Sequence, residues 1–175
     1  MAHLSRDTSA GLRKISAIAP PHTGLSVRKA LLFGTLAVGT LDILDAFVFF
    51  GLRGVQPIRI LQSIAAGLLG RDAFNGGRGT AVLGLALHFF IAFTIVLVFV
   101  LASRRLPMLT RHPVITGLVY GVAVYLVMTF VVVPASAAGG RGLPAWPVAL
   151  NGVLIHMFGV GLPASLAARA AARAR

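Results

Sequence analysis

Four apolar runs, each long enough to cross a lipid bilayer, constrain this sequence more than any other feature. They cover about residues 30–51, 80–102, 114–134 and 147–168. A helix needs about 20 apolar residues to span the hydrocarbon core of a bilayer. The chain has 175 residues, of which 57% are hydrophobic, too many for one soluble domain of this size. We therefore expect an all-α integral membrane protein built as a bundle of four transmembrane helices.

The polar sequence outside these runs predicts two tails around one membrane domain. We expect a flexible basic tail at 1–29, the membrane domain at 30–168 and a short basic tail at 169–175. The first apolar run is longer than the roughly 7–15 apolar residues of a secretory signal, and no cleavage pattern of small residues follows it. Because the first tail bears arginine and is poor in acids, an organellar transit peptide is the alternative there.

The connection between the first two spans contains a short amphipathic stretch that predicts a helix. Pro57 suits a first helical position and Gly70 suits a helix end. One side of this helix carries leucine and isoleucine, and the other carries Arg59, Gln62 and Ser63. At about 13 residues this helix is too short to span a bilayer. We therefore expect it to lie in the membrane interface on the outer side, or to enter the membrane as a re-entrant segment.

Basic residues gather on one side of the predicted topology. The sequence has sixteen Lys and Arg against four acids, a formal net charge of +12. Eleven of the sixteen fall in the two tails and in the loop at 103–113, which four spans place on the same side. The positive-inside rule therefore predicts a bacterial inner-membrane protein with both termini in the cytoplasm and basic residues at anionic lipid headgroups. No basic stripe alternates with aromatic residues, so we expect no nucleic-acid partner.

Four ionisable side chains inside the predicted spans are the candidate functional residues. They are Asp42, Asp45, His88 and His156. An acidic side chain at the centre of a bilayer costs roughly 2.5–3.5 kcal/mol, so each one needs a compensating environment or a function. With a rise of about 1.5 Å per residue, Asp42 and His156 fall within about 2 Å of the midplane and the other two roughly 4–6 Å towards the outer side. We therefore expect all four to meet in one layer.

Small and polar residues in the spans indicate where helices touch. Gly117 and Gly121 have the GxxxG spacing that favours close helix packing, either inside the protein or against a second copy. Pro163 predicts a kink in the last span. Asn151 and Gln62 are candidate hydrogen-bonding accessories of the ionisable residues.

Several segments together carry a resemblance to known proteins. They are GTLDILDAF, LRGVQPIRILQSIAAGLLG, LGLALHFFIAF, SRRLP and GLVYGVAVYLVM. With them the chain resembles a group of small bacterial four-span inner-membrane proteins without an assigned activity, and more distantly YagU-type inner-membrane proteins. In the YagU type a His-bearing second span, a basic turn ending in proline and a His-bearing last span follow in the same order, whereas the LDILD stretch has no good match there. The resemblance implies a location and a topology, and it carries over no catalytic residue.

The residues leave two classes of function open. A carboxylate pair facing histidines can pass a proton or hold a cation, and two His with two carboxylates also meet the ligand count of a divalent metal such as zinc. His88 and His156 could instead hold a haem, although the sequence requires no cofactor. In the other class, the polar cluster only fixes helix order, and the chain is a structural or assembly module that packs on a membrane partner. The sequence has no cysteine, no HExxH and no GxSxG motif, so we expect no enzymatic activity.

Overall fold

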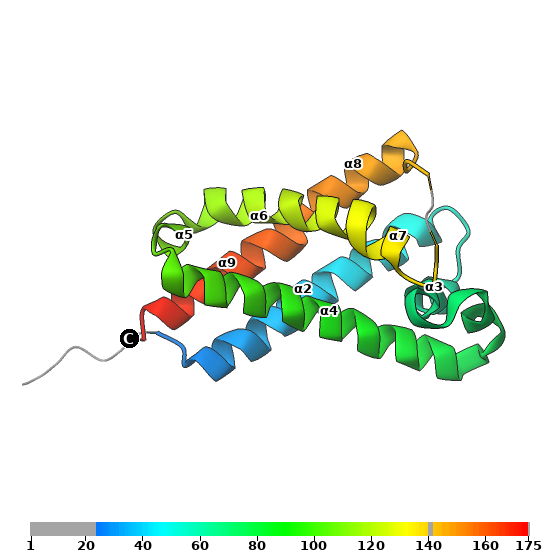
Figure 1. Ribbon diagram of the computed structural model, residues 1–175, viewed down its shortest axis with the longest axis horizontal. Coiled ribbons are helices and arrows are strands. Elements are labelled where there is room, and N and C mark those ends of the chain that lie inside the picture. The colour runs from blue at the N-terminus through cyan, green and yellow to red at the C-terminus, as the bar shows by residue number, and fades with distance from the viewer. Residues whose placement is uncertain (1–23, 140–141, 175) are drawn as a thin grey trace, which may run out of the picture.

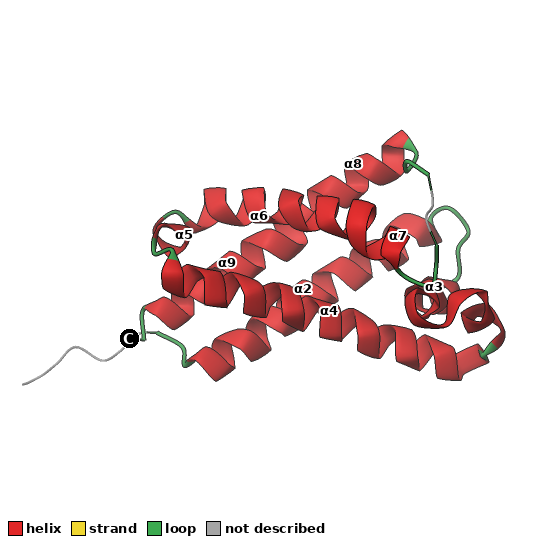
Figure 2. Ribbon diagram, in the orientation of Figure 1, coloured by secondary structure: helices red, strands yellow, loops and turns green. Residues whose placement is uncertain are grey.

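The computed structural model describes residues 24–139 and 142–174 and confirms the all-α class (Figure 2). The described residues form helices and no strand. In chain order the elements are α2 (Val27–Gly51), α3 (Pro57–Leu69), the 3-10 turn η1 (Gly70–Asn75), α4 (Gly77–Arg105), α5 (Met108–Arg111), α6 (Pro113–Val127), the π-helical η2 (Met128–Val132), α7 (Val133–Ala135), α8 (Trp146–Ile155), the π-helical η3 (His156–Gly161) and α9 (Leu162–Ala172).

Within residues 24–139 and 142–174, four helical stretches are long and apolar enough to span a membrane. They are Val27–Gly51, Gly77–Arg105, Pro113–Ala135 and Trp146–Ala172. Each of them contains one of the four predicted spans, so the predicted number and order of spans are confirmed. The predicted tail at 1–29 lies outside the described residues as far as residue 23. The predicted tail at 169–175 begins in a helix, because α9 continues to Ala172.

The four spans form one bundle whose connections lie at its two ends (Figure 1). At one end lie the start of α2, the end of α9 and the turn from α4 through α5 to α6. The backbone N–H of Leu25 donates to the carbonyl oxygen of Ala170 at 3.0 Å, which joins the first and last spans there. The short helices α3 and α7 lie at the opposite end, called the α3 end below.

The third and fourth spans touch through glycine. A Cβ added at Gly121 would overlap the carbonyl group of His156, and one added at Gly161 would overlap the carbonyl oxygen of Gly117. The two backbones can therefore approach closely because no side chain separates them. The GxxxG face of Gly117 and Gly121 is thus used inside the chain, which is one of the two alternatives that the spacing left open.

Both spans with an internal proline adopt π-helical geometry just before it. The segment η2 ends two residues before Pro134, and η3 ends two residues before Pro163. Proline has no N–H for the carbonyl group four residues back, and its ring clashes with that group. A wider π turn relieves both problems without ending the helix, and such turns are frequent at functional sites. Where the sequence predicts a kink at Pro163, the structure has a π segment that begins at His156.

The predicted short helix forms as α3, over Pro57–Leu69, and packs on α4. Gly84 of α4 allows this contact, because an added Cβ would overlap the carbonyl oxygen of Leu61. Gln62 is 2% exposed and faces α4, whereas Leu68 is 61% exposed. The side of α3 that carries Gln62 therefore faces protein, whereas Leu68 and Leu69 at its end face outwards, where lipid would lie.

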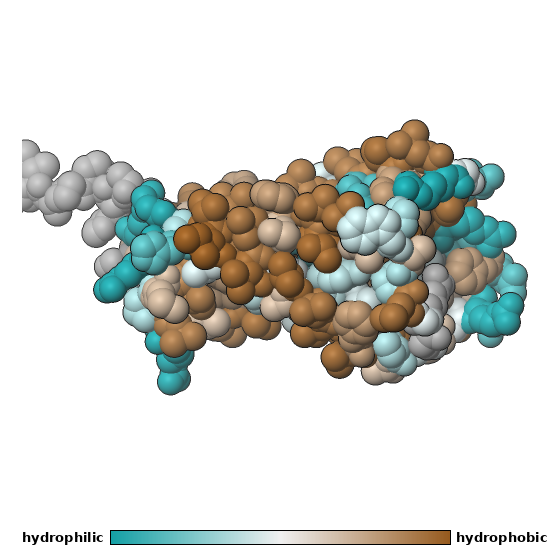
Figure 3. Space-filling model, turned by 90° about the horizontal axis from the view of Figure 1, so that it is seen from above, coloured by the Kyte–Doolittle hydropathy of each residue, from teal (hydrophilic) through white to brown (hydrophobic). Residues whose placement is uncertain are grey.

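Apolar side chains cover the outside of the bundle. Figure 3 shows hydrophobic residues over most of the middle of the face it presents, with hydrophilic residues towards both ends. Large side chains such as Leu32, Phe90 and Phe130 are more than half exposed. Soluble monomers rarely expose so much continuous apolar surface, whereas a bilayer covers it. The surface thus supports a multi-pass membrane protein.

Replacing Gly121 by alanine should destabilise the bundle, whereas the same change at Gly51 should not. The new methyl group at Gly121 would meet the backbone of His156, which cannot rotate away, while nothing lies within 4 Å of a Cβ at Gly51. Overpacking of this kind costs about 1–3 kcal/mol in the free energy of unfolding. Thermal or denaturant unfolding in detergent measures both variants against the wild type, and equal stabilities would contradict the packing described.

Candidate functional site

A cavity of about 370 Å³, partly open to the outside of the bundle, lies between α2, α3, α4, α7 and the two π segments. Most of its lining is apolar and includes Ile43, Ile60, Ile64, Ile91 and Ile95. Its polar lining side chains are Asp42, Ser63, His88 and His156. Three of the four predicted ionisable residues thus meet at one cavity, and each comes from a different span.

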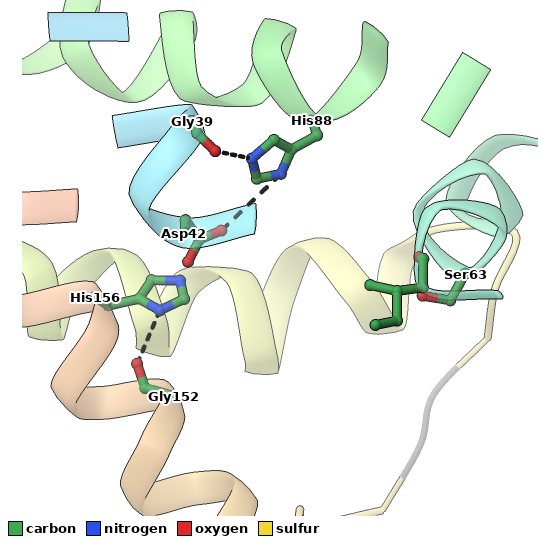
Figure 4. A network of polar contacts seen from close by, with 7 residues as sticks. Gly39, Asp42, Ser63, His88, Gly152 and His156 are labelled. Carbon is green, nitrogen blue, oxygen red and sulfur yellow. Dashed lines mark hydrogen bonds and ion pairs between the residues drawn. The ribbon is translucent and has the colours of Figure 1, made fainter. Parts of the chain in front are cut away.

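His88 is oriented by the backbone of the neighbouring span. Its Nε2 lies 2.8 Å from the carbonyl oxygen of Gly39. Because a carbonyl oxygen only accepts, Nε2 carries the hydrogen and donates it. Gly39 also lets α4 approach, since an added Cβ would lie 2.5 Å from the ring of Phe89. The Nδ1 of His88 is left facing Asp42, 4.0 Å from its Oδ2 (Figure 4).

His156 is oriented by its own helix. Its Nδ1 donates to the carbonyl oxygen of Gly152 at 2.8 Å. The ring of Tyr125 meets the imidazole edge to face, with 5.6 Å between the ring centroids. Gly152 leaves room for this tyrosine, because an added Cβ would lie 2.5 Å from the tyrosine ring. Because Nδ1 is bonded to Gly152, Nε2 is the nitrogen of His156 that has no such partner. Figure 4 shows Asp42 between the rings of His88 and His156.

Each of these three side chains can take up or release a proton while the rings stay in place. Each imidazole already uses one N–H on a carbonyl oxygen. The other nitrogen of each ring accepts when the ring is neutral and donates when it is protonated. The carboxyl group of Asp42 accepts when ionised and can donate when protonated. The hydrogen bonds that hold the two rings therefore leave one nitrogen of each ring free to take up a proton. Transfer to Asp42 needs a closer approach or a bridging water, because the 4.0 Å between His88 Nδ1 and Asp42 Oδ2 is longer than a hydrogen bond.

Asp45 does not join this cluster. Its Oδ2 accepts a hydrogen bond from Nδ2 of Asn151 at 2.7 Å, which ties α2 to α8. Three residues along an α-helix turn a side chain about 60° away from the first one. The carboxylate of Asp45 therefore lies beside the cavity lining rather than in it. The single layer expected for four ionisable residues holds three of them, and Asn151 is the partner of the fourth.

Gln62 also lies apart from the cluster. Its Nε2 donates to the carbonyl oxygen of Gly77 at 3.0 Å, and its Oε1 accepts from Nη1 of Arg59 at 3.3 Å. The same Nη1 donates to the carbonyl oxygen of Phe74 at 3.0 Å. These bonds hold α3 and η1 on the start of α4. Gln62 therefore positions the helix that covers the cavity, and it does not contact the ionisable residues.

The cluster does not assemble the four ligands predicted for a divalent metal. In the part of the chain that the structure describes, no three His, Cys, Asp or Glu side chains are placed to hold a metal ion together. One predicted carboxylate, that of Asp45, is bonded to Asn151 instead. The haem alternative at His88 and His156 stays a prediction.

A second cavity of about 270 Å³ continues from the first along α3 and α7. The two cavities share Ser63, Ile64, Ile91, Met128 and Val133. The second one reaches Ser136, near the α3 end of the bundle. Towards the other end the interior is filled by core side chains that are at most 2% exposed: Val96, Phe99, Val100, Ala164 and Ala168. The second cavity therefore extends from the cluster towards the α3 end, and packed side chains fill the interior towards the end where α9 finishes.

Sequence reasoning does not find every part of this site. Ser63 lines both cavities, and its Oγ donates to the carbonyl oxygen of Ile60 at 2.7 Å. Its position depends on how α3 folds over the bundle, which no local pattern encodes. The sequence also does not reveal that the carbonyl groups of Gly39 and Gly152 orient the two histidines. The glycines themselves indicate that a neighbouring side chain comes close to the backbone at these two positions. A glycine lets a neighbouring ring approach the backbone closely.

A single cysteine at Ser63 should react with a small membrane-impermeant methanethiosulfonate only when the reagent is added on the side of the α3 end. The cavity connects Ser63 to that end, whereas the core closes the path from the other. The sequence contains no cysteine, so Ser63→Cys provides the one thiol. Labelling in vesicles of both orientations, followed by mass spectrometry, measures the accessibility.

Ser103→Cys is the matched control, because Ser103 Oγ also donates to a carbonyl three residues back but lies near the opposite end of α4. It should react only from the opposite side. Val96→Cys, at a position 0% exposed, should stay unlabelled from both sides. Equal labelling of Ser63→Cys from both sides would contradict the closed core.

In comparisons with protein-family models, curated proteins and solved structures, nothing matches this chain. The resemblance described from the sequence therefore stays a prediction. The site is defined by its own geometry, which is a carboxyl group held between two oriented imidazoles in an apolar four-span bundle.

Proposed function

We propose that this chain is a multi-pass protein of the bacterial inner membrane that binds and passes a proton, or holds a cation in its place, at Asp42. The observation that carries the proposal is the position of Asp42 between His88 and His156 at an internal cavity. Ionisable residues inside membrane spans mark ion pathways and proton relays by default. No enzymatic activity is part of the proposal.

The charge of the cluster supports a cationic ligand. An ionised Asp42 between two neutral imidazoles leaves one negative charge at a mostly apolar cavity. Among the described residues its ion-pair partner is His88, which is charged only when protonated. Burying an unpaired charge costs several kcal/mol. One proton or one monovalent cation removes that cost, so its binding is favourable.

The distribution of basic residues supports the proposed orientation. Seven described basic residues lie at the end where α2 begins and α9 finishes: Arg28, Lys29, Arg104, Arg105, Arg111, Arg169 and Arg173. Four lie at the α3 end: Arg53, Arg59, Arg71 and Arg78. The positive-inside rule favours the first end in the cytoplasm, at anionic lipid headgroups. Asp42 would then exchange its proton with the outer side, and passage to the cytoplasmic side would require the packed core around Val96 and Phe99 to open.

The alternative is a structural module whose polar groups only fix helix order. The bond between Asp45 and Asn151 favours this role for that pair, because it joins two spans and lies beside the cavity lining. The GxxxG face is occupied within the chain, so it does not offer a surface to a membrane partner or a second copy. Asp42 differs from Asp45 in facing a cavity and two histidines. The two aspartates therefore separate the two functions experimentally.

Asp42→Asn should abolish proton movement, whereas Asp45→Asn should lower stability and leave proton movement largely intact. Both changes remove one carboxylate from α2, but only the first removes the group at the cavity. We expect the proton flux to fall by about a hundredfold in Asp42→Asn, because a positioned proton-transfer group typically contributes that much. The flux is measured in reconstituted vesicles with an internal pH-sensitive dye, after a pH step.

Thermal unfolding of the same samples provides the control for folding. A folded Asp42→Asn protein with wild-type flux would support the structural module. A wild-type protein that conducts no more protons than empty vesicles would overturn the proposed proton passage.

A further inference from the structure

The cavity beside Asp42 is larger than proton exchange requires. A relay of protons needs only side chains or waters in contact, whereas this space is about 370 Å³ and continues into a second one of about 270 Å³. Its size falls in the range of about 300–1,000 Å³ found for small-molecule sites, which are mostly apolar with a few placed polar groups. Isoleucine supplies much of the lining, and His88 and His156 lie on either side of Asp42, while Ser63 lies apart on α3 (Figure 4). The space therefore has the features of a site for an organic molecule.

The polar groups at this cavity are hydrogen-bond acceptors when the cluster holds no proton. An ionised Asp42 accepts only, and a neutral His88 offers Nδ1 because its Nε2 hydrogen is already bonded. A neutral His156 offers Nε2 for the same reason. The hydroxyl hydrogen of Ser63 is directed to the carbonyl oxygen of Ile60, which leaves its oxygen lone pairs. The complementary ligand therefore has donors, a positive charge and an apolar body.

We propose that the cavity binds a small organic ammonium ion, with the ammonium group at Asp42 and the hydrocarbon part against Ile91 and Ile95. This assignment rests on the proposed cation site and names the class of its ligand. An ammonium group has only donors, so it can satisfy the carboxylate and the two free ring nitrogens together. Its single charge neutralises the single charge of Asp42. The second cavity, past Ser63 to Ser136, provides the route from the α3 end.

Binding of the ammonium ion is coupled to release of a proton. Both cations neutralise the same carboxylate, so one proton leaves the cluster when one ammonium ion binds to its protonated form. The affinity should therefore rise by about tenfold per pH unit while the free cluster is protonated, and it should level off above that range. A neutral molecule of the same shape has no such dependence.

The test is equilibrium binding of radiolabelled cyclohexylammonium to the full chain purified in detergent. We expect one molecule per chain, an affinity that rises with pH, and no competition by cyclohexanol, which has a similar shape and no charge. Asp42→Asn should weaken binding by about tenfold to a hundredfold, the loss expected for a hydrogen bond to a charged group. Asp45→Asn, the matched control on the same helix, should bind like the wild type.

A second variant keeps the carboxylate and fills the space. Ala46 lines the cavity, so Ala46→Phe should also weaken cyclohexylammonium binding by about tenfold or more, with Asp42 intact. Equal binding by Asp42→Asn and the wild type, or equal competition by cyclohexanol, would overturn the assignment. A wild type that binds no ammonium ion but shows a proton flux that depends on Asp42 would overturn this inference and leave the proposed function standing. Absence of both binding and flux would overturn both.

Discussion

A carboxyl group inside hydrocarbon is the constraint on which the arrangement of this bundle depends. Asp42 cannot be compensated from its own helix, because the residues one turn away on α2 are Val38, Gly39, Asp45 and Ala46, and none of them is basic. The compensating groups come from α4 and η3, and both are imidazoles. A histidine is suited to this position because it can be neutral or charged near neutral pH. The first, second and fourth spans thus each contribute one residue to this ionisable cluster.

Glycine determines how closely the helices around the cluster approach. Gly39 and Gly152 each supply the carbonyl oxygen that orients one histidine. Gly121 lets the third span lie against the backbone of His156, and Gly84 lets α3 lie against α4. The positions of the cavity walls are therefore set by backbone contacts. Small residues at these contacts let the backbones approach closely, which places the two imidazoles on facing spans.

The sequence predicts the spans and the depth of the polar residues in the membrane. It does not predict as well which neighbouring helix each polar side chain faces. Hydropathy and length locate all four spans, and Pro57 with Gly70 locates α3, because these properties are local. Depth follows from the rise of a helix, which brings Asp42 together with both histidines. The direction of Asp45 depends on which neighbour α2 meets at that turn, and this neighbour is Asn151, more than a hundred residues away. The cavity and the position of Ser63 depend on tertiary packing alone.

The π segment η3 divides the fourth span into two helices, α8 and α9, and each of them turns its own face towards its neighbours. Each residue turns an α-helix by about 100°, so the wider turn changes the face that all later residues present. Before it, Asn151 is directed to α2, and after it, Ser165 donates to the carbonyl oxygen of Pro113 at 2.7 Å, at the start of α6. An insertion or deletion of one residue at η3 would therefore redirect His156 while the last helix stays anchored. In an evolving sequence, the ionisable cluster could be rearranged at this turn without loss of the bundle.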